Sequence, residues 1–274
     1  MEPLFYQWHA DPLVLLMVMA LIYFHYRLPG HSLAKNRICF WSAIGLIVLT
    51  TCSPLHFLGM HIYFSAHMIT HVVLLLIAGP LLVMSIGPNP SAVILKKISI
   101  FLHKRSWLAW LTAVGIMWCW HIPALFDASF TGMSGFTIMP LLHAGTMLLA
   151  GMLFSWPLVG PFPETHIHPL SGIIYLSTAC ISCSLLGLLI TFAPINTFHH
   201  YGMARSLMNG RLSNPWGFSA ATDQQAAGLI MWVPCCFVYL SGCLYLLQRW
   251  FAAKDPNIGS KAPISLTLSM TKHE

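Results

Sequence analysis

Charged residues are scarce in this chain of 274 residues, because lysine, arginine, aspartate and glutamate together make up only 7% of it. A soluble domain carries roughly 25% charged residues. Thirteen basic and seven acidic side chains do not cover the surface of a 30.5 kDa globule in water. Hydrophobic residues make up 57% of the chain, and its mean hydropathy is +0.73. This composition excludes a soluble enzyme, a disordered protein and a nucleic-acid-binding domain, and it indicates an integral membrane protein.

Three further features are missing. The first ten residues contain Glu2 but no lysine or arginine, so the basic region of a secretory signal is absent and we expect the first apolar run to stay as a membrane anchor. The eight cysteines lack the spacing of a secreted disulfide framework and fall mostly in hydrophobic runs, where they can serve as small packing residues. The chain has no P-loop, nucleophile elbow or acid pair placed for hydrolysis, and we expect that it is not an enzyme.

What the chain does have is a series of long apolar runs. A helix needs about 20 mostly apolar residues to cross a bilayer, and in lipid each segment must satisfy its own backbone polar groups. Runs near that length lie at residues 10–27, 38–55, 61–86, 106–122, 136–156, 169–193 and 223–250. The sequence therefore predicts an all-α fold, a polytopic membrane helix bundle with seven transmembrane helices. We expect one domain over residues 1–251 and a flexible cytoplasmic tail over 252–274.

The basic residues orient this bundle. All of the thirteen cations except Arg205 and Arg211 fall in alternate connections or at the C-terminal end, on one side of the predicted membrane. Connections on the cytoplasmic side carry the excess of lysine and arginine. The sequence therefore predicts that the N-terminus is outside and the C-terminus is in the cytoplasm.

Histidine is unusually abundant, with fifteen histidines against seven acids. His67 and His71 lie four residues apart in the third run, so they share one helix face with Cβ atoms roughly 6 Å apart. Two imidazoles at this spacing can chelate one transition metal. Because Met60 and Met68 are close in sequence and soft thioethers favour copper, the pattern indicates copper, especially Cu(I). Hydrogen bonds between helices are the structural alternative, but ionisable residues inside a membrane are costly and point to function.

A helix start lies just before the third run. With Ser53 as N-cap and Pro54 as the first residue, a helix that continued through the run would place His56 and Met60 on the stripe of His67. Such a helix would line up imidazoles and thioethers from the outer surface into the membrane.

Other segments offer partners for this stripe. In the fifth run Met139, His143 and Met147 share one face, and we expect His143 to lie at the depth of His67 and His71. His121 and Asp127, at the outer end of the fourth run, either complete a site or cap and anchor that end. Asp223 suits the positive N-terminal end of the seventh helix, which is a sufficient structural role. Three further pairs have either a metal-binding or a structural role: Cys180 with Cys183, Cys235 with Cys236, and His199 with His200.

Several segments together match a family pattern. They are Ser65-Ala-His67-Met68-Ile-Thr-His71, Ala78-Gly-Pro-Leu-Leu, Trp120-His121-Ile-Pro-Ala-Leu-Phe-Asp127, Phe154-Ser-Trp-Pro-Leu-Val-Gly-Pro161, Trp216-Gly-Phe-Ser and Asp223-Gln-Gln-Ala-Ala-Gly-Leu-Ile-Met-Trp232. From about residue 53 to 245 the chain resembles the multi-span CtaG family of cytochrome c oxidase assembly factors. The pattern departs at the fifth helix, where many relatives have Glu-His and this chain reads Leu142-His143.

The resemblance implies a multi-pass protein of the bacterial inner (cytoplasmic) membrane that helps to mature a haem-copper oxidase by delivering copper to its CuB site. The implied partners are a haem-copper oxidase subunit, membrane lipid and a periplasmic copper donor, with no nucleic acid. Carried over onto this chain, the family's functional candidates are His67, Met68, His71, His121, Asp127, Asp223 and Gln224. With His143 and Met60 added from the spacing argument, we expect the metal ligands among the histidines and methionines, and a supporting or docking role for Asp127, Asp223 and Gln224.

Two alternatives stay open. The first is a haem-binding redox or haem-handling protein, in which His71 and His143 bracket one haem iron. Against it, a spacing of four residues between His67 and His71 fits one metal ion better than two haems. The second is a copper permease, which would need a continuous ligand path through the bilayer, and donors on the inner side are sparse.

Overall fold

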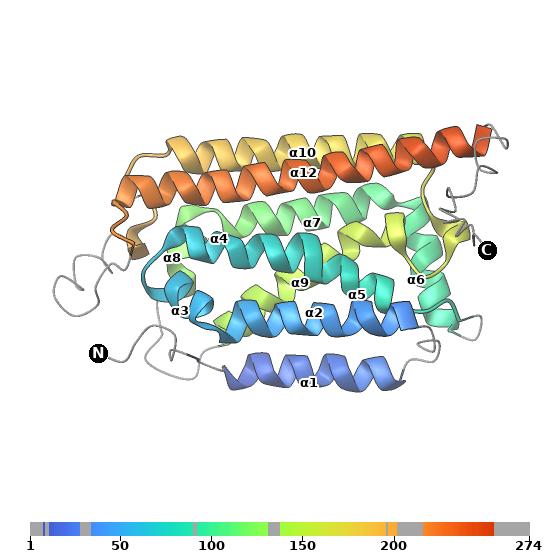
Figure 1. Ribbon diagram of the computed structural model, residues 1–274, viewed down its shortest axis with the longest axis horizontal. Coiled ribbons are helices and arrows are strands. Elements are labelled where there is room, and N and C mark those ends of the chain that lie inside the picture. Colours follow the sequence, from blue (N-terminus) through green and yellow to red (C-terminus); the bar gives the residue numbers. More distant parts are fainter. Residues whose placement is uncertain are drawn as a thin grey trace, which may run out of the picture.

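The computed structural model describes residues 8, 11–27, 34–89, 92–130, 138–195, 197–201 and 216–254. Within these ranges the chain is helical and contains no strand, in agreement with the predicted all-α class (Figure 1). The α-helices are α1 (Pro12–Arg27), α2 (Ala34–Cys52), α3 (Pro54–His61), α4 (Phe64–Val73), α5 (Gly79–Ser85), α6 (Val93–Lys104), α7 (Ser106–Trp120), α8 (Pro123–Phe130), α9 (Met139–Val159), α10 (Pro169–Phe192) and α12 (Ala220–Lys254). Residues Leu74–Ala78 form a π-helical turn between α4 and α5, and Pro163–Thr165 form a 3-10 turn. Arg205, Arg211 and most of the predicted tail lie outside the described residues.

Each of the seven predicted apolar runs contains a helix. Four segments are long and apolar enough to cross a membrane: Phe64–Ser85, Met139–Val159, Pro169–Phe192 and Ala220–Ala253. The count rises to six if α2 with α3, bent by 45°, and α7 with α8, bent by 67°, each form one broken span. Helix α1 is apolar but has only 16 residues. The described residues thus give a multi-pass helical bundle with four to six candidate spans, while the seventh span and the orientation remain predictions.

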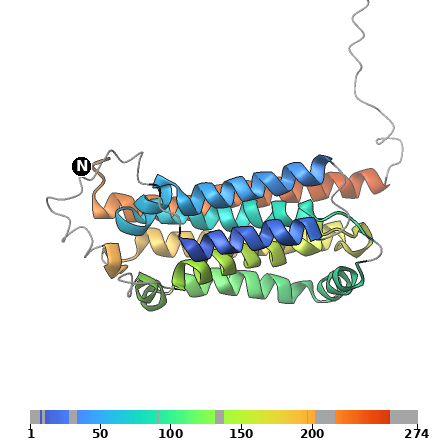
Figure 2. The same ribbon diagram turned by 90° about the horizontal axis from the view of Figure 1, so that it is seen from below.

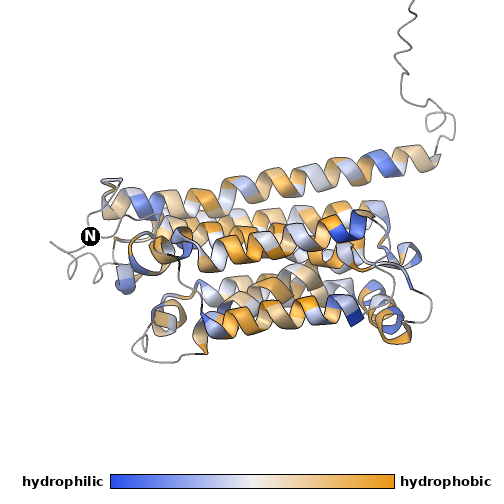
Figure 3. Ribbon diagram, turned by 60° about the horizontal axis from the view of Figure 1, so that its bottom comes forward, coloured by the Kyte–Doolittle hydropathy of each residue, from blue (hydrophilic) through white to orange (hydrophobic). Residues whose placement is uncertain are grey.

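The long helices alternate in direction, so the two ends of the bundle differ (Figures 1 and 2). We call the end at which α1, α4, α9 and α12 begin the histidine end, and the opposite one the basic end. Every lysine and arginine that the structure describes lies at or near the basic end, on the last turn of α1, the start of α2, the segment from α6 to Arg105, or the end of α12. Figure 3 shows that hydrophobic residues predominate along the middle of the helices and that hydrophilic residues gather at the two ends.

Helix α6 is an element that the sequence analysis treated only as a connection. It runs across the basic end, nearly perpendicular to the long helices (Figures 1 and 2). Trp156 of α9 donates a hydrogen bond from its indole nitrogen to Ser99 Oγ at 2.9 Å, which ties α6 to the bundle. Its lysines interrupt the apolar residues at helical spacing, and for this reason no long apolar run marked it in the sequence.

The segment from Ser53 to His71 is not one continuous helix, so the predicted stripe from His56 to His71 is wrong. Ser53 is indeed the N-cap of α3, since its side chain accepts a hydrogen bond from Leu55 N at 3.1 Å, and Pro54 is the first residue. The chain then turns after His61, and α4 begins at Phe64. Gly59 permits this turn, because a Cβ there would stand 2.9 Å from the backbone nitrogen of His67. Helix α3 therefore packs against the first turn of α4 instead of extending it.

Helices α4, α5 and α9 approach each other closely in the centre of the bundle. A Cβ at Gly79 would lie 2.7 Å from the carbonyl carbon of Gly151, and a Cβ at Gly151 would overlap the carbonyl oxygen of Leu75 in the π-helical turn. His71 meets His143, and Leu75, four residues later, meets Gly151, eight residues later on α9. Because the residue numbers increase in the same direction on both sides of the contact, α4 and α9 run parallel. This contact sets the position of α9 on the face of α4 that carries the histidines.

Candidate metal centre

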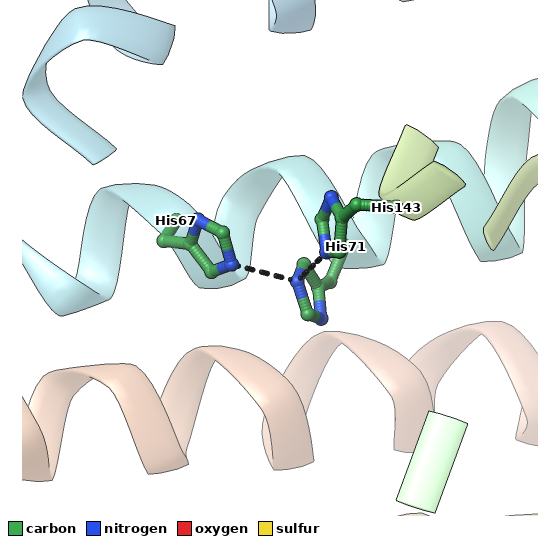
Figure 4. Close-up of side chains that lie close together, drawn as sticks. All are labelled: His67, His71 and His143. Atoms are coloured by element: carbon green, nitrogen blue, oxygen red, sulfur yellow. Dashed lines mark hydrogen bonds between the residues drawn. The ribbon is translucent and has the colours of Figure 1, made fainter. Parts of the chain in front are cut away.

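Three histidines from two helices meet at the histidine end of the bundle. His67 and His71 lie one turn apart on α4, and His143 reaches them from α9 (Figure 4). The Nε2 atoms of His67 and His71 are 2.9 Å apart, and those of His71 and His143 are 2.6 Å apart. One ring nitrogen from each residue lies within 4.8 Å of the others. The contact that the sequence predicted between the third and fifth apolar runs is therefore present, and we call these three residues the histidine cluster.

The spacing of these nitrogens suits a metal ion after a small movement. At a metal–nitrogen distance of about 2.0–2.1 Å, two imidazole ligands of one tetrahedral ion stand about 3.3 Å apart. The observed separations of 2.6 and 2.9 Å therefore need to open by less than about 1 Å, and the third pair, which lies within 4.8 Å, needs to close by at most about 1.5 Å. The other ring nitrogen of His71, Nδ1, is buried without a hydrogen-bond partner and is not the atom that faces His67 and His143.

The first turn of α4 is held by a side chain from the far end of the sequence. Tyr63, at the N-cap position of α4, makes no side-chain cap. Instead Asp223 of α12 accepts hydrogen bonds from Phe64 N at 2.8 Å, from Ser65 N at 3.1 Å and from Ser65 Oγ at 2.6 Å. A carboxyl group at this position satisfies free amides and complements the positive helix end. Asp223 is almost fully buried and fixes the turn that leads into His67.

Two other residues for which we predicted a supporting or docking role also form hydrogen bonds with the ends of other helical segments. Gln224, next to Asp223, donates from Nε2 to the carbonyls of Ile190 at 3.2 Å and Ala193 at 2.7 Å, which satisfies the C-terminal end of α10. Asp127 on α8 accepts from the backbone nitrogens of His199 at 3.2 Å and His200 at 3.1 Å. Each of the three side chains therefore ties one helical segment to the end of another, which a local reading of the sequence does not reveal.

His121 and Met68 form a separate contact behind the histidine cluster. His121 Nδ1 lies 2.6 Å from the carbonyl oxygen of Met117, which can only accept, so Nδ1 is the donor and a neutral ring leaves Nε2 unprotonated. That Nε2 atom lies 3.3 Å from Met68 Sδ, and the ring of His121 is 4.9 Å from the ring of His71. A basic nitrogen and a thioether thus face each other beside the cluster, and both are buried.

Met60 does not join the histidine cluster. It lies on α3 and lines a neighbouring cavity that His67 and His143 also line. Its carbonyl oxygen accepts from His200 Nε2 at 2.9 Å.

The His199–His200 pair is tied to the bundle. His199 Nδ1 lies 3.1 Å from Asp127 Oδ2, and the ring of His200 stacks on Phe130 at 3.9 Å. Burial lowers the pKa of His200, against the opposing effects of the Met60 carbonyl and Asp127. The described contacts of both rings are those of structural residues.

Two residues around His143 were missed by the sequence analysis. Trp120 packs edge-on against the ring of His143 at 5.0 Å and donates from its indole nitrogen to Thr146 Oγ1 at 2.9 Å. Its contact with Thr146, one turn beyond His143, depends on how α7 and α9 pack, and no pattern in either segment signals it.

The two cysteine pairs that the sequence singled out, Cys180 with Cys183 and Cys235 with Cys236, lie on α10 and α12, which pack against each other. Cys180 Sγ and Cys236 Sγ are 3.4 Å apart, and Cys183 Sγ lies 3.2 Å from the carbonyl oxygen of Met231. All eight thiols are free in the structure. Among the described residues, the histidine cluster is the one group of three or more histidine, cysteine or acidic side chains with ligand atoms this close.

Comparison with known proteins assigns the chain to a family. The model of the cytochrome c oxidase caa3 assembly factor family, Caa3_CtaG, matches residues 18–253. No curated protein and no solved structure gives a significant match. The match covers every helix that holds the histidine cluster and its caps. The chain is therefore a member of the Caa3_CtaG family of cytochrome c oxidase assembly factors.

Proposed function

We propose that this protein binds copper transiently at the histidine cluster and delivers it to the CuB site of a haem-copper cytochrome c oxidase. The observation that carries the proposal is the convergence of three Nε2 atoms from α4 and α9 in a chain of an oxidase assembly family. Imidazole ligands suit copper, and the Met68–His121 pair beside the cluster adds a soft thioether that favours Cu(I) over harder ions. The role is that of a carrier and not of an enzyme.

The side of the membrane follows from the two ends of the bundle. The described cations gather at the basic end, while the histidine cluster lies toward the opposite end. By the positive-inside rule the basic end faces the cytoplasm of a bacterial inner membrane, so the cluster lies in the outer half of the bilayer. A periplasmic copper donor and an oxidase subunit would both reach it from that side.

The donor set favours exchange over storage. Three imidazoles leave a fourth position open on a tetrahedral ion. No acidic residue in the described part of the chain belongs to the cluster, so a bound Cu(I) ion would keep a net positive charge in a largely apolar setting. Both features lower the cost of passing the ion to a partner that offers a better ligand set.

The haem alternative fits the cluster less well. The two axial ligands of one haem stand on opposite faces of the porphyrin. His71 Nε2 instead lies 2.6 Å from His143 Nε2 and 2.9 Å from His67 Nε2, which leaves no room for a porphyrin between these rings.

The test is metal content of the detergent-purified protein after anaerobic loading with Cu(I). We expect about one copper per chain in the wild type, because three ligands converge on one point, and none in a His67→Ala/His71→Ala variant. His143→Ala should weaken binding strongly, since it removes the only ligand from α9. The matched control is His103→Ala, which removes a histidine of α6 at the basic end.

Two results would contradict the proposal. Equal copper in the wild type and in the double variant would place the metal elsewhere. A Soret band in the purified protein would favour haem. In cells, a strain with the double variant should assemble an oxidase that lacks CuB, whereas the His103→Ala strain should assemble a complete one.

A further inference from the structure

A cavity of about 400 Å³ adjoins the histidine cluster at the histidine end of the bundle. Helices α1, α3, α4, α8 and α9 contribute to its walls. Its lining includes exposed side chains, Trp8 at 61% and Met139 at 37% exposure, and buried ones, His67 at 7% and Thr70 at 5%. The cavity thus extends from an exposed rim to a buried floor at which two ligands of the cluster lie.

The cavity reaches the cluster from one side only. His67 and His143 line it, whereas His71 does not and is nearly fully buried. The ring of His71 instead contacts the ring of His121, whose Nε2 atom faces Met68 Sδ. An ion that binds all three nitrogens would therefore enter the cluster from the cavity, and return to the cavity, past His67 and His143.

The walls carry donors for a soft cation. Met60 of α3 and Met139 of α9 contribute two thioethers, and His56 and His61 of α3 contribute two imidazoles. Asp11 is the one acidic residue among the described lining residues, and its carboxyl group accepts hydrogen bonds from the backbone nitrogens of Leu13 and Val14. Thioethers bind Cu(I) and have little affinity for hard divalent ions. The lining therefore favours soft cations through its thioethers, and not cations in general through negative charge.

We propose that this cavity is the vestibule through which Cu(I) enters and leaves the histidine cluster, and that Met60 and Met139 are the transfer ligands on its walls. The inference rests on the proposed copper site and adds its route and its selectivity. A neutral thioether on each of two helices holds the ion briefly as it passes from an outside donor to His67 and His143. The step exchanges ligands on Cu(I) and changes no oxidation state.

The experiment separates the rate of transfer from the strength of binding. Cu(I) is supplied as its bicinchoninate complex to the purified full chain, and the loss of the coloured complex is followed in stopped flow. A Met60→Leu/Met139→Leu variant removes both sulfurs at nearly constant volume. We expect its loading rate to fall about tenfold, which corresponds to about 1.4 kcal/mol of lost transition-state stabilisation. Its equilibrium copper content and affinity should stay within about twofold of the wild type.

The matched control is Met147→Leu. Met147 lies on α9 two turns beyond Met139, is fully buried in the core, and does not line the cavity. Its loading rate should equal that of the wild type, and so should its affinity.

Each other outcome overturns the inference. An unchanged loading rate in the double leucine variant would show that the thioethers take no part in transfer. A loss of equilibrium affinity in that variant would make Met60 and Met139 resident ligands. If the wild type binds copper but the loading rate does not change when the two thioethers are removed, the proposed vestibule is wrong and the proposed copper site stands. If the wild type binds no Cu(I), both are wrong.

Discussion

Two of the close approaches through glycine in this bundle differ in the side chains that they bring together. In the α10–α12 pair a Cβ at Gly187 would lie 2.7 Å from the carbonyl oxygen of Gly228. In the α4–α9 region a Cβ at Gly79 would lie equally close to the carbonyl carbon of Gly151. The α10–α12 pair brings thiols together, with Cys180 and Cys236 in contact, whereas the α4–α9 pair brings together His67, His71 and His143.

The two pairs also differ in backbone regularity. The 24 residues of α10 form one unbroken α-helix. The α4 segment begins after a sharp turn, is capped from another helix by Asp223, and changes to a π-helical turn at Leu74, three residues after His71. Such π-turns occur often at functional sites. The comparison indicates that close packing at glycine occurs in more than one part of this fold. The histidine cluster lies where such packing is combined with a π-helical turn and with a cap from another helix.

The largest effect should come from Gly151→Ala, because the added methyl group would meet the backbone of Leu75, which side-chain movement does not relieve. We expect a loss of about 3 kcal/mol in the free energy of unfolding and loss of Cu(I) binding, since α9 would move away from α4. Gly187→Ala should destabilise the protein similarly and leave copper binding intact. Thermal unfolding in detergent and copper content measure the two quantities.

The control for both substitutions is Gly115→Ala on α7. A Cβ at Gly115 meets nothing within 4 Å, so this variant should keep or gain up to about 1 kcal/mol of stability. Wild-type copper binding by Gly151→Ala would refute the role of this contact in placing His143.

A smaller effect is expected for Asp223→Ala. It leaves the backbone nitrogens of Phe64 and Ser65 without their acceptor, which should cost about 2 kcal/mol of stability. Because α4 would fray at the turn that leads to His67, Cu(I) affinity should also fall. The stability and the Cu(I) affinity of Asp223→Asn should lie between those of the wild type and of Asp223→Ala.

Asp127→Ala tests whether this effect is specific to α4. It removes the cap of the segment at His199 and His200 but leaves α4 capped, so it should reduce stability less and keep copper affinity. Equal affinities in the Asp223→Ala and wild-type proteins would show that the cap does not position the cluster.

The smallest effect is expected for the double variant Cys180→Ser/Cys236→Ser. Thiols are weak hydrogen-bonding groups, so the change should alter stability by less than about 1 kcal/mol and leave about one copper per chain. Cys119→Ser, at an exposed position on α7, is the control. Loss of copper from the double variant alone would bring the thiols into the metal path.

The sequence predicted local features well and distant ones poorly. The seven apolar runs, the N-cap at Ser53 and the shared face of His67 and His71 follow from composition and helical spacing, and the structure contains all three. The predicted continuous helix from Ser53 into the third run is wrong, because Gly59 allows α3 to turn back against the backbone of His67. Helix α6 was missed because its apolar residues are interrupted by lysines.

The roles of the polar residues divide in the same way. Asp223 has a sufficient local role at the start of its own helix, but in the structure it caps α4, about 160 residues earlier in the chain. Gln224 and Asp127 likewise cap helical segments other than their own. Sequence spacing identified the residues, and helix packing decided what each one contacts.

The sequence by itself determined that this protein is an all-helical membrane protein with a histidine pair on one helix face, because apolar length and helical period are properties of adjacent residues. Only the tertiary structure decided that His143 completes the cluster, that Met60 lines a cavity beside it, and that His121 pairs with Met68. These contacts join segments more than 50 residues apart, and they depend on how closely the helices pack at Gly79 and Gly151 and on the cap that Asp223 provides.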